Sequence, residues 1–93
     1  MEKNALKELQ NTIERLIGPD GCPWDKEQTP ESLADYVIEE SHELVSAIRS
    51  GNVGDVREEL GDVAFLLLFV ARLYEKRGQF NFDDALNASR AKM

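Results

Sequence analysis

Residues 29–77 read TPESLADYVIEESHELVSAIRSGNVGDVREELGDVAFLLLFVARLYEKR. This stretch decides the fold, because it contains two helix patterns joined by a short glycine-containing connection. Thr29-Pro30-Glu31 is typical of a helix start, with a hydroxyl N-cap, a proline in the first turn and an acid near the positive helix end. The first helix should run to about Ser50, and Gly51 supplies a left-handed stop. Its apolar face comprises Leu33, Val37, Leu44 and Ile48.

The second helix pattern follows the tight connection at residues 51–54. Residues 55–58 have a capping-box arrangement, and the helix they open can run to Arg77 before Gly78. Because only about four residues join the two helices, we expect them to fold back antiparallel as a hairpin. Residues 63–71 are apolar on every side of the helix and need cover all round, so we predict an oligomer with this helix central to the interface.

Shorter patterns flank the hairpin. Apolar residues recur at helical spacing in residues 4–17, and Asn81 begins a capped pattern near the C-terminus. Residues 18–30 are rich in glycine and proline and are predicted to form a loop. No strand pattern or repeat is found in the sequence. We therefore predict a single all-α domain over residues 1–93: a small bundle of about four helices with a central antiparallel helical hairpin, completed by oligomerisation.

Composition narrows the class of protein. Ninety-three residues make one small domain. Eighteen acidic residues against eleven basic ones give a net charge of −7, which opposes binding to a nucleic-acid backbone. The longest apolar run, residues 63–71, is about half of the ~20 residues that a membrane-spanning helix requires. Cys22 is the only cysteine, and the first residues lack the apolar segment of a signal peptide. We expect a cytoplasmic protein with no nucleic-acid or membrane partner.

Acidic side chains gather on one side of each hairpin helix. At about 100° per residue, Glu39, Glu40 and Glu43 fall within an arc of about 100° on the first helix. On the second helix, Glu59 and Asp62 head a line whose later members are all apolar. Both acidic sets therefore border faces that are expected to be buried.

Antiparallel packing would make Glu40 and Glu43 face Glu59 and Asp62. Four bare carboxylates are unfavourable together at low dielectric, yet they are the oxygen ligands that hard divalent cations such as Mg²⁺ or Mn²⁺ require. The alternative is that acids near a helix N-terminus merely complement the helix dipole in water. Because both acidic sets lie on helices that should pair, the sequence favours a metal site.

Three other residues have the chemistry of a functional site. Glu39 and His42 have the Glu-x-x-His spacing of di-iron helical bundles, but the motif occurs once, so His42 is expected at the edge of the acidic arc or in solvent. Trp24 and Lys26 are suited to stacking on a base and pairing with phosphate. The alternative for Trp24 is to pack as a lid over the small core.

These acids, taken with the loop GCPWDKEQT at residues 21–29, resemble the MazG nucleoside triphosphate pyrophosphohydrolases of the all-α pyrophosphatase superfamily. The family pattern is EExxE, a spacer and ExxD, here residues 39–43 and 59–62. The likeness runs from about residue 18 to the end of the chain. Such chains usually continue into a basic, His-Pro-containing segment, whereas this sequence stops at Met93, so we expect a truncated or naturally short form.

The resemblance implies Mg²⁺-dependent hydrolysis of a nucleoside triphosphate to the monophosphate and pyrophosphate, with Mn²⁺ as a substitute, by a homo-oligomer that is a dimer or a dimer of dimers. It implies a role in removing aberrant nucleotides. Glu39 becomes the candidate for orienting or deprotonating the attacking water, and Trp24 and Lys26 the candidates for binding substrate. The implied metal ligands are Glu40, Glu43, Glu59 and Asp62. A non-catalytic helical dimerisation module, or a degenerate metal-binding relative, is the alternative.

Overall fold

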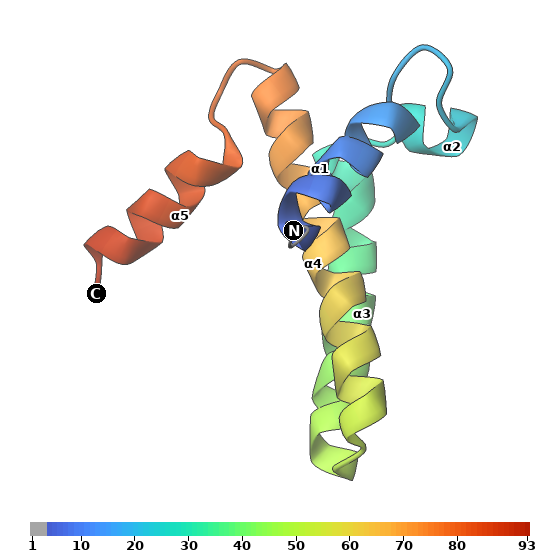
Figure 1. Cartoon of the computed structure of the whole chain (residues 1–93), viewed down its shortest axis with the longest axis vertical. Helices are drawn as coiled ribbons and strands as arrows, with labels where there is room; N and C mark the ends of the chain where they lie inside the picture. Colours follow the sequence, from blue (N-terminus) through green and yellow to red (C-terminus); the bar gives the residue numbers. More distant parts are fainter. Residues whose placement is uncertain (1–3) are drawn as a thin grey trace.

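The computed structural model describes residues 4–93, which form five helices and no strand. They are α1 (Ala5–Leu16), α2 (Pro23–Lys26), α3 (Pro30–Ser50), α4 (Val53–Lys76) and α5 (Phe82–Ala91). Figure 1 shows α3 and α4 side by side as a long antiparallel hairpin, with α1 across the end opposite the turn and α5 extending away. The predicted all-α fold with a central helical hairpin is confirmed. Within the described residues, no helix is long and apolar enough to cross a membrane.

The first hairpin helix begins and ends where its sequence signals lie. The Thr29 hydroxyl accepts a hydrogen bond from the Ser32 backbone N–H at 3.1 Å, and the Ser32 hydroxyl accepts one from the Thr29 N–H at 2.9 Å. This reciprocal pairing satisfies two donors that the first turn leaves free. At the other end Gly51 has φ of 78°, the left-handed conformation that favours glycine. Both ends of α3 are therefore fixed by local chemistry.

The second hairpin helix begins earlier than predicted. Asn52 is the N-cap of α4, and its side-chain oxygen accepts a hydrogen bond from the Asp55 N–H at 3.1 Å. The capping box expected at residues 55–58 is therefore wrong, and Asp55 lies inside the first turn. Asparagine and aspartate are comparable N-caps, so the sequence offers two starts. The earlier start adds residues to α4 and leaves a turn of only Gly51 and Asn52.

The predicted loop at residues 18–30 contains the four-residue helix α2, so that prediction is wrong in part. Pro23 occupies its first turn, where a missing N–H is harmless. The preceding chain lies tightly against α1: the Cys22 N–H donates to the Leu16 carbonyl at 2.9 Å, and a Cβ on Gly21 would lie 2.1 Å from that oxygen. This close approach requires glycine and turns the segment back, which places Trp24 beside α3.

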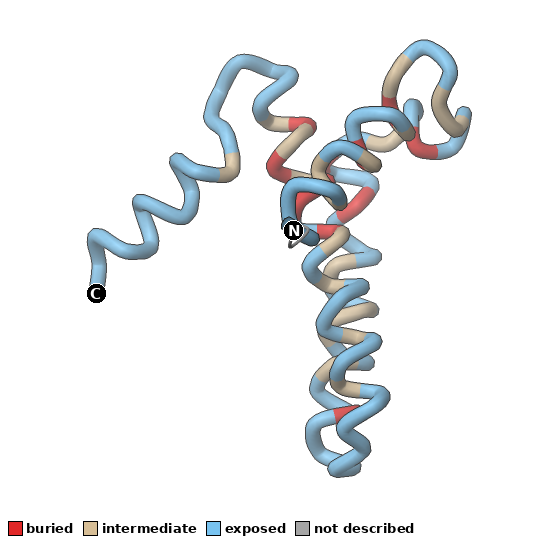
Figure 2. Tube along the Cα trace, viewed as in Figure 1, coloured by how far each residue is buried: buried red, intermediate tan, exposed pale blue. Residues whose placement is uncertain are grey.

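The hydrophobic core is small and lies at one end of the hairpin. Figure 2 shows most buried segments where α1, α3 and α4 meet, and pale, exposed chain along the rest of the hairpin. The core cluster comprises Ile13, Ile17, Leu33, Leu66, Leu68, Phe69 and Leu73. We call the less covered part, residues 38–67, the stem. Ile48 belongs to the apolar face of α3 but lies in the stem and is 58% exposed, whereas the neighbouring Ala47 is buried.

The apolar stretch of α4 is not covered all round. Leu66, Leu68 and Phe69 are buried, whereas Leu67 is 48% exposed. The radius of gyration is 14.5 Å, above the roughly 12 Å expected of a compact domain of this length. The described chain therefore leaves apolar surface along the stem without cover.

Two ion pairs connect other elements to the C-terminal half of α4. The Arg72 guanidinium pairs with Glu14 of α1, and its hydrogen bonds lower the pKa of that carboxyl. Arg77, the C-cap of α4, donates to Glu31 of α3 at 2.9 Å. Because these pairs are largely exposed, they orient the elements more than they stabilise the fold.

Candidate metal centre

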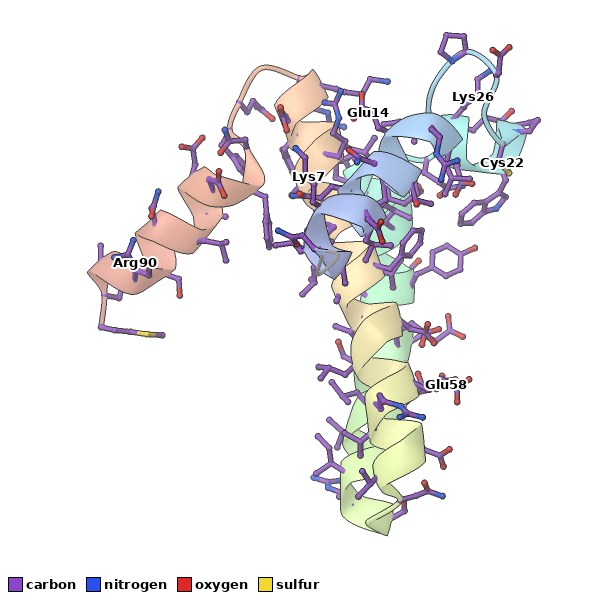
Figure 3. The ribbon with its side chains drawn as sticks, viewed as in Figure 1. Lys7, Glu14, Cys22, Lys26, Glu58 and Arg90 are labelled. Carbon is purple, nitrogen blue, oxygen red and sulfur yellow. The ribbon has the colours of Figure 1, made fainter. Side chains whose placement is uncertain are left out.

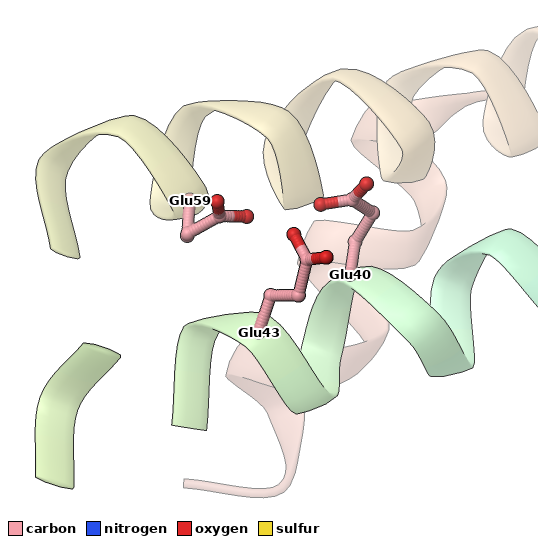
Figure 4. A group of neighbouring side chains, drawn as sticks. All are labelled: Glu40, Glu43 and Glu59. Atoms are coloured by element: carbon pink, nitrogen blue, oxygen red, sulfur yellow. The ribbon is translucent and has the colours of Figure 1, made fainter. Parts of the chain in front are cut away.

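Three glutamates converge between the two hairpin helices. Glu40 and Glu43 lie one turn apart on α3, so they share a face, and Glu59 faces them from α4. One carboxylate oxygen from each lies within 4.8 Å of the other two. Figure 4 shows the three carboxylates directed at the same space between the helices. We call these residues the glutamate trio.

Two oxygens of the trio are buried without a hydrogen-bond partner. They are Oε2 of Glu40 and Oε2 of Glu59, and no donor among residues 4–93 reaches either of them. A buried carboxylate oxygen without a donor is costly, because the group has lost water and gained nothing in exchange. This arrangement needs a positive partner or a proton.

A proton partly meets this need in the metal-free chain. Loss of water raises the pKa of Glu59 from its ordinary 4.5 to about 7, and the neighbouring carboxylates of Glu40 and Glu43 add to the shift. The nearby carboxylates of Glu40 and Glu43 favour the protonated form of Glu59, because their negative charges oppose its ionisation. Glu59 therefore keeps its proton to a higher pH than an ordinary glutamate does.

The donor set of the trio fits a hard divalent cation. All the available ligands are carboxylate oxygens, which Mg²⁺, Mn²⁺ and Ca²⁺ prefer over the nitrogen and sulfur ligands that suit zinc or copper. A cation would supply charge to both unpartnered oxygens and would make the crowding of Glu40, Glu43 and Glu59 favourable. His42 is exposed and outside the trio, so the described site lacks the histidine of a di-iron centre.

Two predicted site residues lie beside the trio rather than within it. Asp62 is exposed and, with Glu40, lines a cavity of about 220 Å³ next to the trio. Its shorter side chain starts one turn nearer the core than that of Glu59, which accounts for this separate position. Glu39 is also exposed, on α3 immediately before Glu40. The structure thus brings together three of the four predicted ligands.

Trp24 and Lys26, the predicted substrate contacts, are placed differently although both belong to α2. Trp24 is 47% exposed and lines the same cavity as Glu40, together with the core residues Leu66 and Phe69. The Lys26 ammonium donates to the Pro19 carbonyl at 3.0 Å, which holds it to its own segment. Figure 3 shows Lys26 near the connection between α1 and α2, far from the turn of the hairpin.

The sequence reasoning missed Tyr36, whose ring lies edge-on to Trp24 with centroids 5.7 Å apart and an interplanar angle of 77°. Tyr36 also lines the cavity beside the trio. A signal was present, because Tyr36 lies four residues before Glu40 and therefore on the same face of α3. Phe65, three residues after Asp62, reaches the cavity from α4 for the same reason.

Comparison with known proteins shows the family and the fold to which this chain is similar. The family model of the MazG nucleotide pyrophosphohydrolase domain matches residues 28–93, which include the whole hairpin and α5. The solved structure of a mazG-related protein from Thermotoga maritima superimposes with a TM-score of 0.79 at 26% identity, over 92% of this chain and 74% of the other.

Curated relatives are also similar over nearly the whole chain. The nucleoside triphosphate pyrophosphohydrolase/pyrophosphatase MazG of Thermotoga maritima is 41% identical over 95% of this chain and 34% of its own length. The nucleoside triphosphate pyrophosphohydrolase of Escherichia coli K12 is 40% identical over 97% of this chain and 35% of its own length. This chain therefore spans about a third of these relatives. On this evidence the chain belongs to the MazG nucleotide pyrophosphohydrolase family.

Proposed function

We propose that this chain hydrolyses nucleoside triphosphates to nucleoside monophosphates and pyrophosphate, with Mg²⁺ as cofactor and Mn²⁺ as a substitute. The glutamate trio is the observation that supports this proposal. Two of its oxygens are buried without a partner and need a cation, and the phosphates of a triphosphate need a cation as well. The names of the relatives in Thermotoga maritima and Escherichia coli support the same activity. An acidic chain of net charge −7 can bind an anionic triphosphate only if cations intervene.

We assign the trio and Asp62 to holding the cation. Glu40, Glu43 and Glu59 supply oxygens from both hairpin helices, and Asp62 is near enough to Glu40 to line the same cavity. When bound, Mg²⁺ neutralises charge on the phosphate oxygens of the substrate. The two helices keep the acidic oxygens in fixed positions, so little reorganisation is needed when substrate arrives.

We assign Glu39 to the attacking water. Its exposed carboxylate, adjacent to Glu40 in sequence, accepts a proton as the water oxygen bonds to the α-phosphorus. The bond from the α-phosphorus to the α,β-bridging oxygen breaks, and pyrophosphate leaves with that oxygen. Trp24 holds the base, and Lys26 pairs with phosphate after giving up its hydrogen bond to Pro19.

We further propose that the activity removes unwanted nucleoside triphosphates from the cytoplasm, where such nucleotides are made and used. Residues 1–93 would act as one MazG-like domain in this role, since the family match includes both acidic segments of the hairpin. The trio, the cavity and the core all lie on α1 to α4, so no second domain is needed to assemble them.

We propose a homodimer formed along the stem. On α4, apolar residues alternate at spacings of three and four, the a/d pattern of a coiled coil. They are Val53, Val56, Leu60, Val63, Leu67, Val70 and Tyr74. On α3, the other helix of the stem, positions 38, 45 and 48 are isoleucine or valine and are exposed. Figure 3 shows mostly carbon along one edge of the stem and carboxylates near Glu58 along the other.

A second copy of this chain is the occupant that fits this surface. Leu60 is 56% exposed and Leu67 is 48% exposed, so part of the a/d row is left open within the described chain. Two identical rows related by a two-fold axis would form a four-helix bundle, with each row buried against its own counterpart. Such a dimer would also supply the missing cover for the apolar stretch of α4 and leave the trio on the outer face.

The proposed reaction predicts where solvent oxygen is incorporated. With Mg²⁺ and a nucleoside triphosphate in isotopically labelled water, we expect the label in the nucleoside monophosphate and none in pyrophosphate, because water attacks the α-phosphorus. Mass spectrometry of the two products checks this, and a chelator should abolish turnover. Label in pyrophosphate, or release of inorganic phosphate alone, would contradict the proposal.

Removing one trio carboxylate should weaken cation binding. We expect Glu59→Gln to lower Mg²⁺ and Mn²⁺ affinity by more than about 10-fold, since loss of even an outer-shell partner costs 10–100-fold. Isothermal titration calorimetry measures the affinities. Glu58→Gln, the matched control, removes the same charge from a neighbouring exposed residue and should bind as the parent does. Equal affinities in the two variants would favour a non-catalytic dimerisation module.

The raised pKa of Glu59 predicts how stability depends on pH when no metal is present. Between about 4.5 and about 7 the folded chain holds a proton on Glu59 that the unfolded chain has lost, so stability falls as pH rises through this range. In chelator, Glu59→Gln should therefore raise Tm more at about pH 8 than at about pH 5. The same two measurements on Glu58→Gln give the baseline, and an identical pattern there would refute the assignment.

Charge in the a/d row should break the proposed dimer. We expect Leu60→Glu to shift the chain from dimer to monomer in analytical ultracentrifugation, because two copies of the new carboxylate would be buried together. Ser46→Glu adds the same charge at an exposed position of α3 outside the row and should remain dimeric. The proposal fails if the parent chain sediments as a monomer at all concentrations or if Leu60→Glu stays dimeric.

A further inference from the structure

The short helix α2 is attached to the preceding chain by several hydrogen bonds and to α3 by one. On the side of α1, the Cys22 backbone N–H and the Lys26 ammonium both donate to carbonyls of the preceding chain. On the side of α3, the Ser32 hydroxyl donates to Oε1 of Gln28 at 2.6 Å. Within the part of the chain that the structure describes, this is the only hydrogen bond between residues 22–28 and α3. The Gln28 side chain is therefore the hydrogen-bonded connection between the two helices.

The Gln28 side chain uses both ends of its amide. While Oε1 accepts from the Ser32 hydroxyl, Nε2 donates to the Trp24 carbonyl at 3.0 Å. An amide offers an acceptor and a donor together, whereas a carboxylate is an acceptor only and could not form both bonds. Ser32 is itself fixed, because its Oγ accepts from the Thr29 N–H in the capping box of α3. We call this chain of hydrogen bonds from Ser32 through Gln28 to Trp24 the amide bridge.

The helix α2 depends on its neighbours for orientation. It has four residues, and in the described chain no side chain caps its first turn. A helix this short is unstable by itself in water. Trp24 also contacts the Tyr36 ring of α3, with centroids 5.7 Å apart. Because hydrogen bonds are directional, the amide bridge restricts the angle between α2 and α3 more closely than this ring contact does.

The amide bridge relates α2 to the acidic face of α3. Glu40 lies eight residues after Ser32 on the same helix, which is about 12 Å along the axis. Trp24 and Glu40 line one cavity, and Gln28 lies outside the set of residues that line it. We propose that Gln28 is a positioning residue, which holds α2 at a fixed angle to α3 and so keeps Trp24 beside Glu40. This proposal rests on the proposed function, in which Trp24 contacts the substrate.

Gln28→Met tests the amide bridge in the reaction, because methionine has a similar length and no amide. We expect KM for a nucleoside triphosphate to rise about 5-fold, the scale of one lost hydrogen bond. The kcat should stay unchanged, since the glutamate trio and Glu39 keep their places and only substrate binding is weakened. Mg²⁺ affinity in calorimetry should also equal that of the parent. Gln79→Met, the matched control, changes an exposed glutamine outside α2 and α3 and should keep the parent KM.

A second measurement needs neither substrate nor metal. Trp24 is the only tryptophan of the chain, so its time-resolved fluorescence anisotropy reports the motion of α2. Gln28→Met should show a larger fast loss of anisotropy than the parent, because α2 is freed from α3. Gln28→Glu near pH 7 should behave like Gln28→Met, since its carboxylate cannot donate to the Trp24 carbonyl. Circular dichroism confirms that each variant keeps its long helices.

The two measurements separate this proposal from the proposed function. If Trp24 anisotropy in Gln28→Met equals that of the parent, or if kcat falls together with a rise in KM, the positioning role is refuted even when the parent cleaves nucleotides. If Gln28→Met frees Trp24 while Gln79→Met does not, the amide bridge is supported. That result stands when the parent releases no pyrophosphate, in which case only the proposed reaction fails.

Discussion

Repulsion among three carboxylates held between α3 and α4 is the constraint on which the site depends. Three such carboxylates stay close together only where the packing of other side chains holds them there. Here that packing lies next to the carboxylates along the hairpin. Leu66 and Phe69 are buried one to two turns beyond Asp62 and hold α4 against α3. The hydrophobic core therefore maintains an arrangement that the carboxylates alone would oppose. A cation changes this opposition into attraction.

Much of this architecture is predictable because its signals are local. The hydroxyl and proline at residues 29 and 30, the glycine at 51 and the apolar periodicity each act within one or two turns of helix. Together they define an antiparallel hairpin, and the periodicity then places Glu40 and Glu43 opposite Glu59. The same signals do not decide the start of α4, since Asn52 and Asp55 are both good caps.

What the sequence does not predict depends on contacts between distant segments. The helix α2 forms where the chain turns back against the end of α1, through the contact of Cys22 with Leu16. Burial also depends on distant segments. Periodicity indicates which faces of a helix are apolar, but Ile48 is exposed because no other element of the described chain packs against it. Tyr36 gains its place at the cavity only because α2 carries Trp24 across to it.

The two-residue turn at Gly51 and Asn52 has an evolutionary consequence. The number of residues in this turn determines which acids of α3 and α4 lie opposite each other. The length of the turn therefore affects the site although the turn lies outside it. Each residue added to α4 there would displace it by about 1.5 Å and rotate it by about 100° relative to α3. Insertion or deletion at the tip would thus change which acids face one another across the hairpin, with every acidic codon unchanged.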